Sequence, residues 1–283
     1  MAADSLCFTE LARGIAVGTP APDGWSALVE HPLLIIVGLT GVGKSTTLEK
    51  LAKTELDYTL LPNRRVLTDQ LIIAHMQALD GHPVQLVTDR KLRFNYTRRF
   101  RAQFAGGMSH ALTQLWIDPT ELPANLIFDG LRGADEVTHA LHALPQARFV
   151  VLHAPDVVRV QRLLGRNDVF DQVAGAAQRG AQSQAINSFA DLGLPEATAL
   201  FTSAEEQQLL TLLAHGSVTA DDLRAKLQIV VEERRNYDPS AAIAVLQADA
   251  PDRTLVIDTT QNTPAQVTRA LVNFMTNQSD AGK

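Results

Sequence analysis

Several features that define other protein classes are missing from this chain. It has one cysteine, Cys7, in 283 residues, which excludes an intramolecular disulfide and fits a reducing compartment. No run approaches the roughly 20 consecutive apolar residues of a membrane-spanning helix. The beginning, MAADSLCFTELARG, has neither a basic start nor a long apolar run, so no signal peptide is expected there. These absences favour a cytoplasmic protein without a membrane partner.

An excess of positive charge is also missing. The formal net charge is −6 at pH 7, which gives no general attraction to nucleic acid or to an anionic membrane. An anionic partner must therefore be bound by a local patch. Apolar residues make up 46% of the chain, enough to fill the core of one large domain or of a domain with an insertion. The oligomeric state is left open by the sequence.

A glycine-rich segment follows directly after the apolar run 33–37. It reads GLTGVGKST and fits the pattern GxxxxGK[ST], the phosphate-binding loop that joins a strand to a helix. Its glycines leave backbone amides free to surround a phosphate chain, and the next helix points its positive end at the same place. The predicted nucleotide-binding residues are Gly38, Thr40, Gly41, Val42, Gly43, Lys44, Ser45 and Thr46. Lys44 is expected on the β and γ phosphates, and the Ser45 hydroxyl on a magnesium ion.

Short apolar runs alternate with helix-like segments along the chain, as a parallel sheet covered on both faces requires. This pattern predicts an α/β fold. The predicted strands are 33–37, 57–61, 125–128, 148–153 and 254–257. Residues 1–30 contain two Gly and Pro clusters and are expected to form a lead-in made of turns.

The stretch 172–252 carries no strand signal and is rich in Ala, Gln, Leu and Glu. It is predicted to be a helical insertion before the last strand, with caps near Ser203 and Thr219. The core would then comprise residues 31–171 and 253–277. Within it, an acceptor region is expected at about 62–115 and a lid at about 158–171.

The run 125–128 ends in Asp129. A carboxylate after a strand next to the phosphate-binding loop is placed to orient magnesium through water, so Asp129 is the second predicted metal residue. Arg132 follows closely and is expected to reach a phosphate. Glu136 either orients Arg132 or forms an ordinary surface pair.

Three arginines follow the fourth predicted strand: Arg159, Arg162 and Arg166. Their spacing of three and four residues puts them on one face of a helix that ends near Gly165. Such a face is either solvated or folds over the triphosphate as a lid, and the lid is the preferred hypothesis. Arg132, Arg162 and Arg166, together with Lys44 and Asp129, are therefore the predicted catalytic residues.

These motifs, GLTGVGKSTTLEKL, LIFDGLRGADEV, RLLGR followed by Asp168, and VIDTTQNTPAQV, together resemble P-loop kinases of the nucleoside-monophosphate-kinase type. The loop and RLLGR are similar to guanylate kinase, and DGLRG and IDTT to relatives of adenylate kinase and dephospho-coenzyme-A kinase. The resemblance implies a P-loop NTPase fold with a parallel sheet of order 2-3-1-4-5, ATP with Mg²⁺, and transfer of a phosphoryl group. The acceptor-site pattern of guanylate kinase is not intact, and the helical insertion has no counterpart in the small nucleotide kinases.

The expected acceptor region contains an unusual group of cations. Six of them, and no acid, lie between Arg90 and Arg101, interleaved with the aromatic residues Phe94, Tyr96 and Phe100. Arginine forks suit a phosphomonoester, and aromatic rings can stack on a base. The predicted substrate-binding residues are Arg64, Arg65, Asp69, Asp89, Arg90, Arg93 and Arg98. A hydroxyl acceptor would need a base, for which Asp69 and Asp89 are the candidates.

Two classes of function remain after these observations. The preferred hypothesis is an ATP-dependent phosphotransferase that moves the γ-phosphoryl group of ATP to a small anionic acceptor, such as a nucleotide or another phosphorylated metabolite. A polynucleotide end is a less favoured acceptor. The alternative is an ATP-dependent regulatory module, in which nucleotide occupancy moves the helical insertion against a protein partner. The charged segment 232–238 would face either the lid or that partner.

Overall fold

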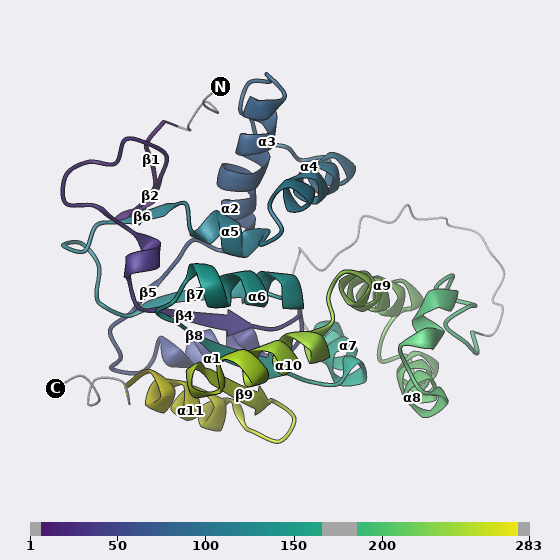
Figure 1. The fold of residues 1–283 in the computed structure, drawn as a ribbon. Helices are drawn as coiled ribbons and strands as arrows, with labels where there is room; N and C mark the ends of the chain where they lie inside the picture. The colour runs from purple at the N-terminus through teal and green to yellow at the C-terminus, as the bar shows by residue number, and fades with distance from the viewer. Residues whose placement is uncertain (1–6, 166–185, 277–283) are drawn as a thin grey trace.

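The computed structural model describes residues 7–165 and 186–276 (Figure 1). A five-stranded sheet forms its centre, and every neighbouring pair of strands in it is parallel. The strands lie in the order β5 (Thr59–Leu60), β7 (Leu126–Leu131), β4 (Leu33–Val37), β8 (Ala147–His153) and β9 (Thr254–Asp258). The α/β class and the strand order 2-3-1-4-5 are therefore confirmed. Edge strand β5 is shorter than predicted because only two of its residues pair with β7.

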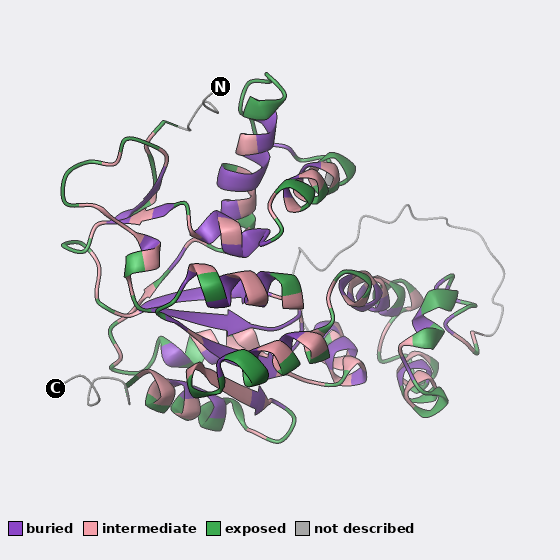
Figure 2. Ribbon diagram, in the orientation of Figure 1, coloured by how far each residue is buried: buried purple, intermediate pink, exposed green. Residues whose placement is uncertain are grey.

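Helices cover both faces of this sheet. Leu33, Ile35 and Val37 of β4 pack on one side with α6 (Ala134–Ala143) and α10 (Pro239–Asp249). Leu34 and Ile36 pack on the other side with α1 (Lys44–Leu51) and α11 (Pro264–Thr276). Since successive residues of a strand point to opposite faces, an uninterrupted apolar run fits this two-sided burial. Figure 2 shows the central strands as the most buried part of the molecule.

A second, antiparallel sheet lies beside the first one. Its strands, in order, are β1 (Thr9–Ala12), β2 (Ile15–Val17), β6 (Leu115–Ile117) and β3 (Ser26–Ala27), and the short helix η1 (Leu28–Glu30) follows β3. The expectation that residues 1–30 form only turns is therefore wrong. β2 is fully buried and pairs with β6, so its stability comes from a partner far along the chain.

The expected acceptor region forms a helical arm, which lies in the chain between β5 of the main sheet and β6 of the small sheet (Figure 1). Its elements are α2 (Arg64–Leu67), the π-helical η2 (Thr68–Ile73), α3 (Ala74–Leu79), α4 (Arg90–Gln103) and α5 (Met108–Leu112). Asn63 caps α2 and Asp89 caps α4 through their side chains. Buried residues of these helices join the same core as β4 and α6, which fixes the arm against the sheet.

The described part of the segment predicted as an insertion, residues 186–252, contains helices joined by turns and no strand. Its elements are η4 (Pro195–Ala199), α8 (Ser203–Ala214), α9 (Ala220–Asn236), then α10 and η5 (Pro251–Arg253). Thr202 rather than Ser203 caps α8, with Glu205 completing the capping box, and Thr219 caps α9 as predicted. α8 and α9 share a core with α7 (Asp156–Leu164), whereas α10 packs on α6 over the main sheet. Among the described helices, none is long and apolar enough to cross a membrane.

Candidate functional site

The phosphate-binding loop connects the buried strand β4 to helix α1, as its motif requires. Gly38 and Gly41 have positive φ values of 155° and 87°, and a Cβ at either position would come within 2.6 Å of Leu152 O or 3.0 Å of Arg159 O. Only glycine fits these positions. Lys44 Nζ donates to the carbonyl oxygens of Gly38 (2.9 Å) and Leu39 (3.1 Å), so the lysine folds back over the loop.

The other loop residues occupy different environments. Val42 is buried, Ser45 is exposed at the start of α1, and Gly43 precedes the helix with φ of 99°. Thr46 and Gly43 line a cavity of about 260 Å³ together with Arg162 and Thr259. A second cavity, of about 230 Å³, lies at the other side of the loop. Its lining residues include Thr40, Lys44, Ser45, Arg65, Asp129 and Arg132.

Asp129 lies opposite Lys44 on the neighbouring strand. Its Oδ1 is 3.9 Å from Lys44 Nζ. Strand β7 continues two residues past Asp129 to Leu131, and the pairing with β4 shifts register there: Ile36 pairs with Asp129, but Val37 pairs with Leu131. The prediction that Asp129 ends the strand is therefore wrong, although its place beside the loop agrees with the sequence.

Both members of this pair are only partly exposed, with 14% of the Lys44 side chain and 23% of the Asp129 side chain accessible. Burial lowers the pKa of Lys44 and raises the pKa of Asp129, and each shift is partly offset by the charge of the other residue. Asp129 Oδ1 is buried without a hydrogen-bond partner. A bound phosphate would compensate Lys44, and a hard cation or its water would compensate Asp129. Asp129 and exposed Ser45 thus fit the predicted Mg²⁺. No cluster of three or more His, Cys, Asp or Glu in the described ranges is arranged to hold a metal.

The arginines of α7 face the loop rather than solvent. Arg159 is 1% exposed and donates from Nε to Thr40 O (2.8 Å) and from Nη1 to Asp156 (2.6 Å). Arg162 donates to Thr259 Oγ1 and Thr259 O, both at 2.8 Å, and to Gly41 O at 3.3 Å. Their spacing does put them on one face, as predicted. Arg159 is buried, so the alternative of a solvated face is wrong for Arg159, whereas Arg162 is half-buried. Arg166 lies outside the described residues.

Glu233 of α9 was singled out by the sequence only as part of the charged segment 232–238, not as a residue of the site. Its carboxylate accepts hydrogen bonds from Thr40 N–H (3.0 Å) and Thr40 Oγ1–H (2.7 Å). Arg132 Nη1 lies 3.0 Å away, and Arg159 also pairs with it. Burial alone would raise the pKa of Glu233, but Arg132, Arg159 and Thr40 outweigh it and lower the pKa. These neighbours therefore favour the carboxylate form of Glu233 beside the phosphate-binding loop.

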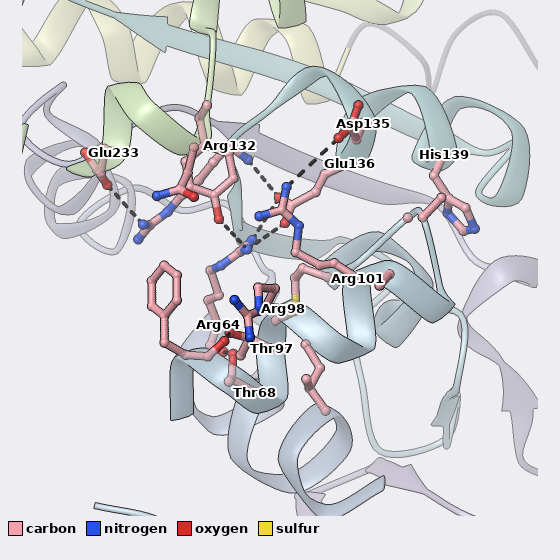
Figure 3. A pocket seen from close by; sticks show the side chains of 18 of the residues that line it. Arg64, Thr68, Thr97, Arg98, Arg101, Arg132, Asp135, Glu136, His139 and Glu233 are labelled. Atoms are coloured by element: carbon pink, nitrogen blue, oxygen red, sulfur yellow. Dashed lines mark hydrogen bonds and ion pairs between the residues drawn. The ribbon is translucent and has the colours of Figure 1, made fainter. Parts of the chain in front are cut away.

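A cavity of about 1020 Å³ opens beside this cluster, between the helical arm and α9. Figure 3 shows Arg64, Arg98, Arg101 and Arg132 gathered around it, with Glu136 and Glu233 close to them. It shares Thr40, Arg64 and Arg132 with the cavity at Lys44. A molecule in the large cavity would therefore lie next to the loop.

Three of the predicted acceptor residues line one or both of these cavities. Arg98 lines the large cavity and is exposed, and Arg65 lines the cavity at Lys44. Arg64 lines both cavities, but its guanidinium bonds Glu136 (2.6 and 2.8 Å) and Gly130 O (2.6 Å).

The remaining predicted acceptor residues bond to other parts of the helical arm or have a side chain that the structure does not describe. Asp69 and Arg93 pair with each other, and the Asp89 carboxylate caps α4 through Leu92 N (2.7 Å). Neither aspartate is among the residues that line the large cavity or the cavity at Lys44, so their proposed role as a base is not supported. The side chain of Arg90 lies outside the described part of the structure.

Two further expectations about this region need correction. Tyr96 and Phe100 are buried in the core, at 5% and 4% exposure, whereas Phe94 is exposed and lines the large cavity. Of the three aromatic residues in the cation cluster, Phe94 is the one placed to stack on a ligand in this cavity. Arg99 pairs with Asp80 at 2.6 Å, so acids from other segments compensate part of the cation cluster. Arg101 and Tyr237 also line the large cavity. The sequence placed Arg101 in the cation cluster and Tyr237 in the charged segment 232–238, but neither was among the predicted substrate-binding residues.

Comparisons with known proteins do not assign an activity to this chain. No protein-family model and no curated protein matches it. It is similar to the structure of TT1252 from Thermus thermophilus, with 15% identity, a TM-score of 0.42, and coverage of 87% of this chain and 98% of that one. The corresponding values are 13%, 0.36, 87% and 81% for a sulfotransferase from Alicyclobacillus acidocaldarius. For a gluconokinase from Sinorhizobium meliloti 1021 they are 14%, 0.33, 88% and 97%. The function is therefore argued from the site.

Proposed function

We propose that this chain is a kinase that transfers the γ-phosphoryl group of ATP to a small anionic acceptor bound in the large cavity. The observation that carries the proposal is the phosphate-binding loop at the junction of two cavities, with Lys44 over the loop and Asp129 opposite it. A donor held at the loop and an acceptor in the large cavity would meet near Thr40, Arg64 and Arg132, the residues that line both cavities. Such positioning supplies much of the catalysis of phosphoryl transfer.

The donor is assigned to the loop side. Lys44 and the loop amides would bind the β and γ phosphates, and the nucleoside would extend toward the cavity of about 260 Å³ lined by Gly43, Thr46 and Arg162. Ser45 and Asp129 would hold Mg²⁺, which shields phosphate charge when it is bound. Arg132 is within reach of both cavities and would stabilise negative charge that develops on the transferred group.

The acceptor is assigned to the large cavity. Arg98 and Arg101 offer cationic groups on its wall, and the ring of Phe94 offers an exposed face for stacking. A nucleoside monophosphate would need no base, because its phosphate is itself the nucleophile. This choice agrees with the absence of Asp69 and Asp89 from the described lining of the cavity. The acceptor is therefore proposed to carry a phosphate rather than only a hydroxyl group.

A coupled assay of ADP formation tests the proposal. Purified protein is incubated with ATP and Mg²⁺, with no acceptor or with a panel of nucleoside monophosphates, nucleosides and short oligonucleotides. We expect ADP formation that depends on one acceptor and disappears in Lys44→Ala. Slow ADP formation that no acceptor changes would instead support a regulatory ATPase, the second candidate, which the contact of α9 with Thr40 favours.

A further inference from the structure

Glu233 connects helix α9 to the phosphate-binding loop through hydrogen bonds and ion pairs. It belongs to α9, which packs with α8 and α7 in a core separate from that of the main sheet. Its side chain is 8% exposed. A buried carboxylate of this kind is costly unless donors satisfy it, and Thr40, Arg132 and Arg159 do so. Within the loop, Thr40 is the residue that donates hydrogen bonds to Glu233.

Thr40 is held from both sides by the ion pair of Glu233 and Arg159. Its N–H and its hydroxyl donate to Glu233, while its carbonyl oxygen accepts from Arg159 Nε at 2.8 Å. Both backbone polar groups and the side chain of Thr40 are thus engaged. The next loop residue, Gly41, lies against the backbone of Arg159. The conformation of the loop just before Lys44 consequently depends on α7 and α9.

The same carboxylate also holds Arg132. Arg132 comes from the segment after β7 and lines both the cavity at Lys44 and the large cavity. Its Nη1 lies 3.0 Å from Glu233 Oε1. Tyr237, directly after α9, lies near Arg132 and Arg101 as well, with their guanidinium carbons 6.0 and 5.6 Å from its ring centre. The end of α9 therefore touches groups on the donor side and on the acceptor side.

From these contacts we infer that Glu233 is a positioning residue that couples the docking of α9 to phosphoryl transfer. It fixes Thr40 of the donor loop and Arg132 of the transfer site with one carboxylate. The inference rests on the proposed kinase function and extends it, because it makes the helical segment a working part of the site. A nucleotide that orders the loop should then also order α9.

Glu233→Gln tests the role with little change in side-chain size. It removes the charge that holds Arg132 and Arg159, and misplacement of about 1 Å costs about 100-fold in rate. We expect kcat to fall about 10- to 100-fold, with a much smaller change in the KM for ATP. Asp221→Asn is the matched control: it is the same chemical change on an exposed residue of the same helix, and its kcat should equal that of the wild type.

A double-mutant cycle separates positioning from a general effect on stability. Because Glu233 acts partly through Arg132, Glu233→Gln should lower kcat by a smaller factor in the Arg132→Ala background than in the wild type, and the remaining loss reports the contact with Thr40. Additive losses in kcat would contradict the inference. Urea unfolding identifies a Glu233→Gln protein that does not fold. In that case Thr40→Val, which removes only the hydroxyl bond to Glu233, takes its place: lowered kcat supports the inference, and unchanged kcat overturns it.

Hydrogen–deuterium exchange of peptides from 220–236 gives a readout that needs no turnover. A non-hydrolysable ATP analogue should slow exchange in α9 of the wild type and of Asp221→Asn, but not of Glu233→Gln. If the analogue binds and α9 of the wild type does not respond, the inference is wrong while the kinase proposal stands. If a fluorescent ATP analogue shows no binding to the wild type, the proposed function fails, and the inference fails with it.

Discussion

Arg64 and Glu136 form an ion pair with two bonds, from Nη2 to Oε1 at 2.6 Å and from Nη1 to Oε2 at 2.8 Å. Glu136 is 1% exposed. Burial alone would lower the pKa of Arg64, but Glu136 outweighs it and raises that pKa. The pair joins α2 of the arm to α6 on the main sheet. The guanidinium of Arg64 therefore stabilises the fold and is not free to bind an acceptor.

Arg64→Ala should therefore destabilise the protein. Removing one partner of a buried ion pair costs about 3–5 kcal/mol, because the other charge is left without compensation. The free energy of unfolding, measured in urea by circular dichroism, should fall by that amount. Arg98→Ala on the cavity wall is the control and should leave it nearly unchanged. A stable Arg64→Ala protein with only a raised acceptor KM would restore Arg64 to the role that the sequence predicted.

Lys44 is expected to be required for turnover. Lys44→Ala should abolish ADP formation while circular dichroism and the urea midpoint stay close to those of the wild type, because the described hydrogen bonds of Lys44 go to loop carbonyls and its described ion pair is a long one, to Asp129. Lys53→Ala, an exposed lysine just after α1, is the control and should keep full activity. Near-native turnover by Lys44→Ala would show that the loop does not hold the donor.

The main sheet could be predicted because its signals are local. The run 33–37 is apolar at every position and buried at every position, and the loop after it has fixed spacing. The small sheet had no such signal: Ile15–Val17 gains its partner from Leu115–Ile117, far away in sequence. The contact of Glu233 with Thr40 could not be predicted for the same reason, since the two residues are 193 positions apart and the sequence identified Glu233 only as part of a charged segment.

Magnesium dependence is expected to act through Asp129. Chelation with EDTA should stop ADP formation, and excess Mg²⁺ should restore it. Asp129→Asn should raise the Mg²⁺ concentration needed for half-maximal activity, because a neutral amide binds a hard cation more weakly than a carboxylate does. Asp57→Asn, an exposed aspartate before β5, should leave the requirement unchanged. An identical Mg²⁺ titration of Asp129→Asn and the wild type would exclude Asp129 from the metal site.

Arg162 is expected to act on donor binding. Its bonds to Thr259 and its place beside Gly43 and Thr46 put it in the cavity proposed for the nucleoside. Arg162→Ala should raise the KM for ATP about 10-fold, the value of one charge-assisted hydrogen bond, with a smaller decrease in kcat. Arg13→Ala, which removes an exposed pair with Glu121, is the control. A large decrease in kcat at unchanged KM would instead favour the lid hypothesis from the sequence.

Acceptor recognition is expected to depend on Arg98 and Arg101. Arg98→Ala and Arg101→Ala should each raise the acceptor KM while the KM for ATP stays constant, because neither residue is among those that line the cavity at Lys44. Arg99→Ala is the matched control, since Arg99 pairs with Asp80 instead. Added salt should weaken the binding of a small acceptor modestly. The affinity for a polynucleotide would decrease steeply, because many of its phosphates contact the protein. If the acceptor KM of Arg98→Ala and of Arg101→Ala equals that of Arg99→Ala and of the wild type, the large cavity is not the acceptor site.

The central claim is that the loop at Lys44 and the large cavity serve one transfer reaction. The most direct measurement is the rate of ADP formation by the wild type at fixed ATP and Mg²⁺, as a function of nucleoside monophosphate concentration. We predict a saturable increase with one acceptor, together with a stoichiometric phosphorylated product, and a shift of the curve to higher acceptor concentration in Arg98→Ala. A slow rate of ADP formation that stays constant across every acceptor, with no phosphorylated product, would contradict the claim.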